Sequence, residues 1–170
     1  MNHFHWEADF RRCYEHALAL YRSGERDAAR YFKKADAAFL ASIGHTAQEM
    51  YDYVEDAGDL SYGDVLLIAS ARRDYFRVIQ KGKPTGHTIR TADLPPKDAA
   101  VAGFVWLPRI IPKARAKLCG EMPPDLMYGC GGDRAFLKKV NIHPADFLRF
   151  VWSARDDDQK IIEYVKRCAA

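Results

Sequence analysis

Apolar residues recur every three or four positions through most of this 170-residue sequence, which is the period of an α-helix rather than the alternation of a strand. The spacing predicts helices over residues 6–21, 27–43, 47–54, 61–79, 108–118, 133–140, 144–153 and 157–168. Gly24 and Gly44 follow two of these segments, and Thr46 lies three residues before Glu49, the spacing of a capping box. We therefore predict an all-α fold of about seven or eight helices.

The length is sufficient for one domain, residues 1–170, that buries a core without metal or disulfide bonds. Four cysteines lie far apart and form no Cys-x-x-Cys pair, and no basic region followed by an apolar run opens the chain. No segment approaches the roughly 20 apolar residues of a membrane span. These features predict a cytoplasmic protein with reduced thiols and no membrane partner. The cysteines are Cys13, Cys119, Cys130 and Cys168.

Charge argues against a nucleic-acid partner. The formal net charge is only +3, because 23 acidic residues nearly balance 26 basic ones. The turn Gly44-His45-Thr46 could belong to a helix-turn-helix motif, but the following helix is acidic and would repel phosphates. Its polar residues are Gln48, Glu49, Asp52, Glu55 and Asp56.

A weak internal repeat relates residues 36–71 to residues 133–167. The string at 36–40, Asp-Ala-Ala-Phe-Leu, recurs at 133–137 as Asp-Arg-Ala-Phe-Leu, and the matches that follow fall on core positions. Each half then reads as one unit of helix, tight turn, helix, loop and helix, and the whole fold as two related helix-turn-helix layers, although any two helical hairpins resemble one another at this level. Periodicity fails between residues 80 and 103, which predicts a long irregular connection with a short extended piece at 87–90.

The segment from Trp106 to Gly120 is predicted to be a short basic helix. Pro108 or Pro112 fits its first turn, and Gly120 fits a left-handed end. Three cations recur at every fourth residue on the face opposite the apolar one: Arg109, Lys113 and Lys117. They could receive a carboxylate or phosphate, form an internal ion-pair set with Glu121, Asp125 or Asp133, or simply face solvent.

This helix and the segment after it resemble a bacterial family known only as a domain of unknown function. The residues that carry the resemblance are Leu107-Pro108-Arg109, the run 113–118, Gly120, Tyr128, Cys130, Asp133 and Phe136-Leu137. The family has a Leu-Pro-Arg opening, a Lys-x-Arg-Ala helix, a Tyr-x-Cys-Pro-Leu-Asp turn and a Phe-Leu helix, and the resemblance covers about residues 106–166. This sequence has Cys130-Gly131-Gly132-Asp133 in place of Cys-Pro-Leu-Asp. The resemblance implies no particular reaction.

Eight residues are candidates for a site around this helix. Lysine, tyrosine, cysteine and histidine exchange protons or attack electrophiles when a neighbouring charge or a helix start activates them. The candidate catalytic residues are Lys113, Tyr128, Cys130 and His143. The candidate substrate-binding residues are Arg109, Arg115, Lys117 and Trp106. The competing interpretation of Cys130 is a small packing residue in a loop.

Metal and cofactors are not expected. His3 and His5, near Glu7 and Asp9, suggest a metal-binding arm, but the sequence places no further ligand. Neither the glycine pattern of dinucleotide sites nor that of triphosphate sites is present. There is also no Gly-x-Ser-x-Gly elbow of a hydrolase.

Two functions follow from these observations. The first is a small cofactor-independent enzyme of lyase or isomerase type, which acts by acid–base chemistry on a small anionic, aromatic-bearing organic substrate held by Arg109, Lys113 and Lys117. The second is a non-catalytic helical module that binds an acidic protein partner through the same surface, or associates with itself as a homodimer. The enzyme requires a closed pocket, whereas the module requires an exposed basic stripe.

Overall fold

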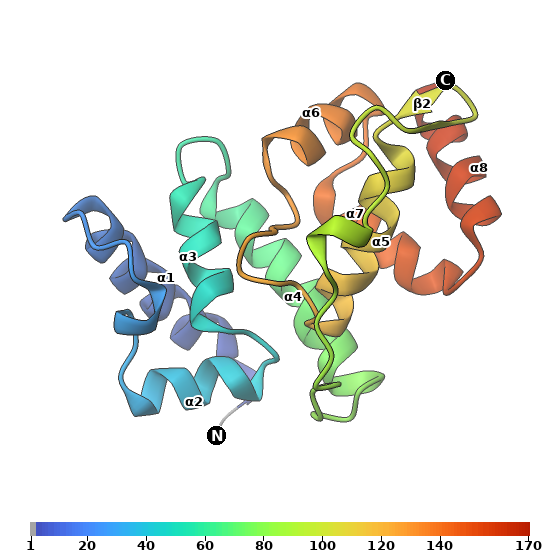
Figure 1. Ribbon diagram of the computed structural model, residues 1–170. Helices are drawn as coiled ribbons and strands as arrows, with labels where there is room; N and C mark the ends of the chain where they lie inside the picture. Colours follow the sequence, from blue (N-terminus) through green and yellow to red (C-terminus); the bar gives the residue numbers. More distant parts are fainter. Residues whose placement is uncertain (1–2) are drawn as a thin grey trace. The chain divides into compact units, whose positions relative to one another are not determined.

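The computed structural model describes residues 3–170 and confirms the all-α fold. The chain divides into two compact units, Met1–Lys83 and Pro84–Ala170. The single domain 1–170 with an internal repeat stays a prediction. Each unit contains four of the eight α-helices found in the described residues (Figure 1). No helix in this part of the chain is long and apolar enough to cross a membrane.

Unit 1 is built around the contact between its first and third α-helices. Phe10, Cys13 and Ala17 of the first are fully buried, as is Met50 of the third. The helices are α1 (Trp6–Arg22), α2 (Lys34–Ser42), α3 (Ala47–Glu55) and α4 (Tyr62–Val78), with short 3-10 helices η1 (His3–His5) and η2 (Ala28–Arg30).

Side-chain caps set two of these boundaries. Thr46 and Glu49 form the predicted capping box at the start of α3, and Ser61 and Asp64 form a second one at α4. The helix predicted over 27–43 is wrong in its first part. Asp27 caps the 3-10 helix η2 instead, and Lys33 has an extended backbone (φ −74°, ψ 166°), so α2 begins only at Lys34.

Unit 2 has a corresponding contact between α5 (Leu107–Cys119) and α7 (Pro144–Ala154). Its other helices are α6 (Gly131–Lys139), α8 (Asp158–Ala169) and the 3-10 helix η3 (Thr91–Asp93). Strands β1 (Ala100–Val101) and β2 (Phe104–Val105) form an antiparallel hairpin in which Ala100 faces Val105. At the end of the segment 87–90, where we expected a short extended piece, Arg90 has an extended backbone (φ −102°, ψ 132°).

The two units share their helix order and one turn geometry. Gly44 after α2 and Asn141 after α6 both have a left-handed backbone, with φ of 75° and 55°. In each turn a backbone N–H reaches back to a helix carbonyl, from His45 to Leu40 at 2.8 Å and from Ile142 to Leu137 at 2.9 Å. Origin of the units by duplication stays a prediction.

Helices α1 and α5 also correspond at the offset of the sequence repeat, which pairs residue 36 with residue 133. The buried positions of α1 match buried positions of α5, which the sequence comparison did not include. Phe10, Cys13, Tyr14 and Ala17 correspond to Leu107, Ile110, Ile111 and Ala114.

Candidate functional site

The basic helix α5 begins and ends as predicted, with Pro108 in its first turn and Gly120 in a left-handed conformation (φ 70°) at its end. Trp106 precedes it and also has a left-handed backbone, with φ of 77°. This conformation is uncommon for a bulky residue. It places the indole beside the start of α6, where the indole N–H donates to Asp133.

Asp133 is fully buried and is the centre of a hydrogen-bonded cluster. Its Oδ2 accepts from Lys113 Nζ at 2.6 Å and from the Gly129 backbone N–H at 2.9 Å, and its Oδ1 accepts from Trp106 Nε1 at 2.9 Å. Lys113 is only 1% exposed. Of the alternatives for the cations of α5, the internal ion pair is thus observed at Lys113, where the carboxylate offsets a buried positive charge.

Gly132 allows the indole to approach this closely. A Cβ atom at Gly132 would lie 2.4 Å from Cζ2 of Trp106, well inside van der Waals contact. The departure from the Cys-Pro-Leu-Asp pattern therefore has a structural reason at this position, because leucine in place of Gly132 would displace the indole that donates to Asp133.

Cys130 is the half-buried member of the cluster and links it to the first turn of α6. Its Sγ lies 3.3 Å from Lys113 Nζ, and Cys130 is the N-cap residue of α6 without capping the helix through its side chain. A neighbouring cation and a helix start are the surroundings in which protein thiols react as nucleophiles. The first N–H groups of α6 have no acceptor within the helix and point toward the same end.

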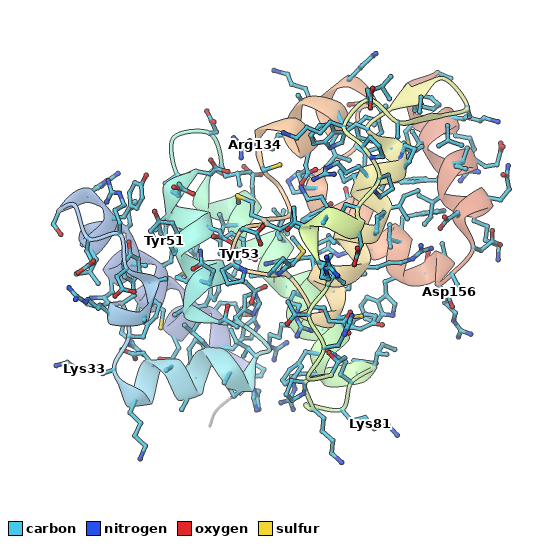
Figure 2. All side chains as sticks on the ribbon, in the orientation of Figure 1. Lys33, Tyr51, Tyr53, Lys81, Arg134 and Asp156 are labelled. Atoms are coloured by element: carbon cyan, nitrogen blue, oxygen red, sulfur yellow. The ribbon has the colours of Figure 1, made fainter. Side chains whose placement is uncertain are left out.

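Arg134, labelled in Figure 2, was not predicted as a site residue. Its Nη1 donates to the Gly129 carbonyl at 2.7 Å, and its Nη2 lies 3.9 Å from the position a Cβ would take on Gly131. A guanidinium therefore lies along the segment that contains Cys130. The spacing of four residues from Cys130 to Arg134 was the available signal, since it places both on one face of a helix.

Tyr128 and His143 are used in other contacts. The Tyr128 hydroxyl donates to the Pro144 carbonyl at 2.8 Å, and burial, with the nearby charge of Asp133, raises the pKa of Tyr128 well above its ordinary value. His143 Nδ1 accepts from the Ala145 N–H at 3.1 Å and caps α7. Both contacts anchor the start of α7.

Two of the cations predicted to bind substrate take separate partners inside unit 2. Arg109 donates to the Pro95 carbonyl at 2.7 Å, and Arg115 donates to the Arg155 carbonyl and to Asp158. These two guanidinium groups therefore do not share the Asp133 cluster with Lys113. The third, Lys117, is buried, at 3% exposed.

Within residues 3–170, no group of three or more His, Cys, Asp or Glu side chains is arranged to hold a metal ion. Nε2 of His3 instead lies 2.9 Å from Nη1 of Arg77. Burial, together with the positive charges of Arg77 and Arg73, lowers the pKa of His3.

Comparison with known proteins gives a family match for the C-terminal part of the chain. No curated protein and no solved structure matches it. Residues 95–170, which include α5 to α8 and the whole cluster around Asp133, match the family described as Domain of unknown function (DUF5069), and this match confirms the resemblance predicted from the Leu-Pro-Arg and Tyr-x-Cys motifs.

Proposed function

We propose that unit 2 is a cofactor-independent enzyme of lyase or isomerase type, in which Cys130 exchanges a proton with a small anionic organic substrate. One observation carries the proposal. The buried ammonium of Lys113 lies between Asp133 Oδ2, at 2.6 Å, and Cys130 Sγ, at 3.3 Å. A thiol, an ammonium and a carboxylate in contact form a set that can take up and return a proton without a cofactor.

Each member of the set has a distinct role in this proposal. The thiolate of Cys130 removes a proton from a carbon next to the substrate's carboxylate or carbonyl. Lys113 donates a hydrogen bond to the sulfur, and Asp133 holds the Lys113 side chain in position. The proton then returns from sulfur to carbon in an isomerisation, or a leaving group departs in an elimination.

The substrate's negative charge is best received at the start of α6. The free N–H groups of the first turn and the guanidinium of Arg134 flank Cys130, and both bind anions. Arg109 and Arg115 fit this role less well, because they donate to Pro95, Arg155 and Asp158, whereas Arg134 contacts the segment that contains Cys130. The half-buried indole of Trp106 beside Gly132 supports a substrate that carries an aromatic ring.

The alternative, a module that binds an acidic partner, requires an exposed basic stripe on α5. Lys113 and Lys117 are 1% and 3% exposed, so two of the three cations of that stripe are covered. This burial favours the enzyme. The four cysteines are all free thiols, which supports the cytoplasm as the compartment.

Proton exchange with solvent tests the proposal. The protein is incubated in D2O with a panel of small aromatic and aliphatic 2-hydroxy, 2-oxo and 2-amino carboxylates, and deuterium uptake next to the carboxylate is followed by proton NMR. We expect Cys130→Ala to lower the uptake rate by about 10²–10⁴-fold. Cys119→Ala, which removes a half-buried thiol outside the cluster, should leave it unchanged. Equal uptake by wild type and Cys130→Ala would refute Cys130 as the base.

A second measurement does not depend on the choice of substrate. Iodoacetamide labelling, quantified by peptide mass spectrometry, should modify Cys130 at least about tenfold faster than Cys119 or Cys168, because only Cys130 has both a contacting ammonium and a helix start. Labelling of all three thiols at one rate would contradict an activated Cys130.

A further inference from the structure

The turn that follows α7 contains an arginine where the backbone favours glycine. Arg155 has φ 55° and ψ −121°, and the Asp157 N–H donates to the Ala154 carbonyl at 3.1 Å across the turn. These angles are those of the second residue of a type II′ turn, a position that glycine dominates because a Cβ is strained there. Asp156, the next residue, marks this turn in Figure 2.

Hydrogen bonds to the main chain stabilise the turn, but none of them requires an arginine side chain at position 155. Arg115 donates to the Arg155 carbonyl from Nη2 at 2.9 Å and also pairs with Asp158 at 2.6 Å. A glycine at position 155 would offer the same carbonyl. Over the described range 3–170, the Arg155 guanidinium has no hydrogen-bond or ion-pair partner, so no polar contact of this side chain offsets the strain of the turn.

This side chain lines a surface hollow of about 380 Å³ together with Arg149, Trp152 and Ser153. The hollow is shallow and open to solvent, so it suits a small ligand that binds weakly. Trp152 is half-buried and contributes an aromatic surface. Arg149 pairs with Asp146 at 3.1 Å, but both side chains are largely exposed, and such pairs exchange partners at little cost.

We propose that this hollow binds a small aromatic anion. Its carboxylate or phosphate group is held between the guanidinium groups of Arg149 and Arg155, and its ring lies on the indole of Trp152. The backbone strain at Arg155 is then the cost of placing a cation at this site. The proposal is independent of Cys130, because it uses residues at the opposite end of α7 from the contacts of Tyr128 and His143.

The experiment measures the binding of benzoate and phenyl phosphate to the full chain. The probe is the indole N–H signal of Trp152 in a proton–nitrogen NMR spectrum, assigned from its absence in Trp152→Phe. We expect both anions to shift this signal with saturation in the millimolar range, whereas benzyl alcohol, which has the ring without the charge, should not. The relative affinities of the two anions distinguish a carboxylate site from a phosphate site.

The decisive variant is Arg155→Gly. It should weaken benzoate binding at least about tenfold and at the same time raise Tm by about 2–4 °C, because glycine removes the strain of the turn. Lys139→Gln, which removes an exposed positive charge elsewhere in unit 2, should alter neither quantity. Unchanged benzoate affinity in Arg155→Gly, a lowered Tm in that variant, or no shift of Trp152 in wild type would each overturn the proposal.

Discussion

Asp36 and Asp133 occupy the same place in the two units, the third residue of α2 and of α6, and each pairs with a cation from the first helix of its own unit. In unit 1 the partner is Arg12 at 2.7 Å, and the side chains are 25% and 56% exposed. In unit 2 the partner is Lys113 at 2.6 Å, and the side chains are 0% and 2% exposed. One helical framework therefore carries a solvated pair in one unit and a buried pair in the other.

The difference arises from the neighbours of the carboxylate. Next to Asp133, the glycine at position 132 admits the indole of Trp106, whereas the residue before Asp36 is the exposed Ala35. Trp106 can donate to Asp133 because α5 begins after it, while the corresponding part of α1 continues as helix through Asp9. The comparison teaches that a covering side chain, and not the ion pair itself, decides whether the site is solvated.

The largest expected effect comes from removing each carboxylate. Asp133→Ala leaves the buried ammonium of Lys113 without its charged partner and should lower the free energy of unfolding by about 3–5 kcal/mol. Asp36→Ala removes an exposed pair and should cost no more than about 1 kcal/mol. Urea unfolding followed by circular dichroism measures both, and the comparison fails if the two variants lose equal stability.

A double variant sharpens this result. Replacement of Lys113 by Met together with Asp133 by Leu removes both charges and keeps an apolar filling, so it should recover most of the stability lost in Asp133→Ala. A double variant as unstable as the single one would show that the hydrogen bonds from Trp106 and Gly129 matter more than the charge.

An intermediate effect is expected from exchanging the residues that precede the two carboxylates. Gly132→Ala places a Cβ against the indole of Trp106 and should destabilise the protein by about 1–3 kcal/mol. The reverse change in unit 1, Ala35→Gly, meets no such contact and should cost at most about 1 kcal/mol, the difference in helix propensity. Thermal unfolding gives both values, and a neutral Gly132→Ala would mean that the indole is not held against α6.

The smallest effect concerns Cys13, a fully buried residue of α1. The corresponding buried residue of α5 is Ile110, which does not titrate. Burial raises the pKa of Cys13 from 9.0 to about 11, and Arg12 acts in the opposite direction. Above pH 9 the unfolded chain therefore loses this proton before the folded chain does. The stability that the neutral thiol provides is complete below pH 9 and decreases as the pH rises toward 11.

Between pH 8.5 and pH 10, Cys13→Ala should consequently lose about 1 kcal/mol less of its unfolding free energy than wild type. Tyrosines are common to both proteins and cancel in this difference. Parallel curves for Cys13→Ala and wild type would show that Cys13 does not titrate in this way.

The sequence predicted the elements whose signals are local. The capping box of Thr46 and Glu49, the left-handed end at Gly120 and the helical period each depend on residues within about one turn of one another. The break before Lys34 was missed because apolar spacing continues through Tyr31, which is buried although it lies outside α2. Its hydroxyl donates to the Glu25 carbonyl, a contact that the spacing does not encode.

The candidate site was only partly predictable for the same reason. The spacing of cations on one face of α5 identified Lys113, and Asp133 was among its predicted ion-pair partners. The burial of this pair was not predictable, because it depends on Trp106 and Gly132. Arg134 and Arg155 were missed, because their importance lies in a backbone carbonyl, a turn angle and a hollow that arise only on folding.

Local sequence signals were sufficient to predict a helical chain, most of its helix ends and the resemblance of its last part to a domain of unknown function, because periodicity, caps and motifs each lie within a short stretch. The tertiary structure alone decided which charges are buried. A charge is desolvated only when side chains distant in sequence close over it, and here Trp106 covers a carboxylate 27 residues away while Lys113 reaches it from the next turns of α5.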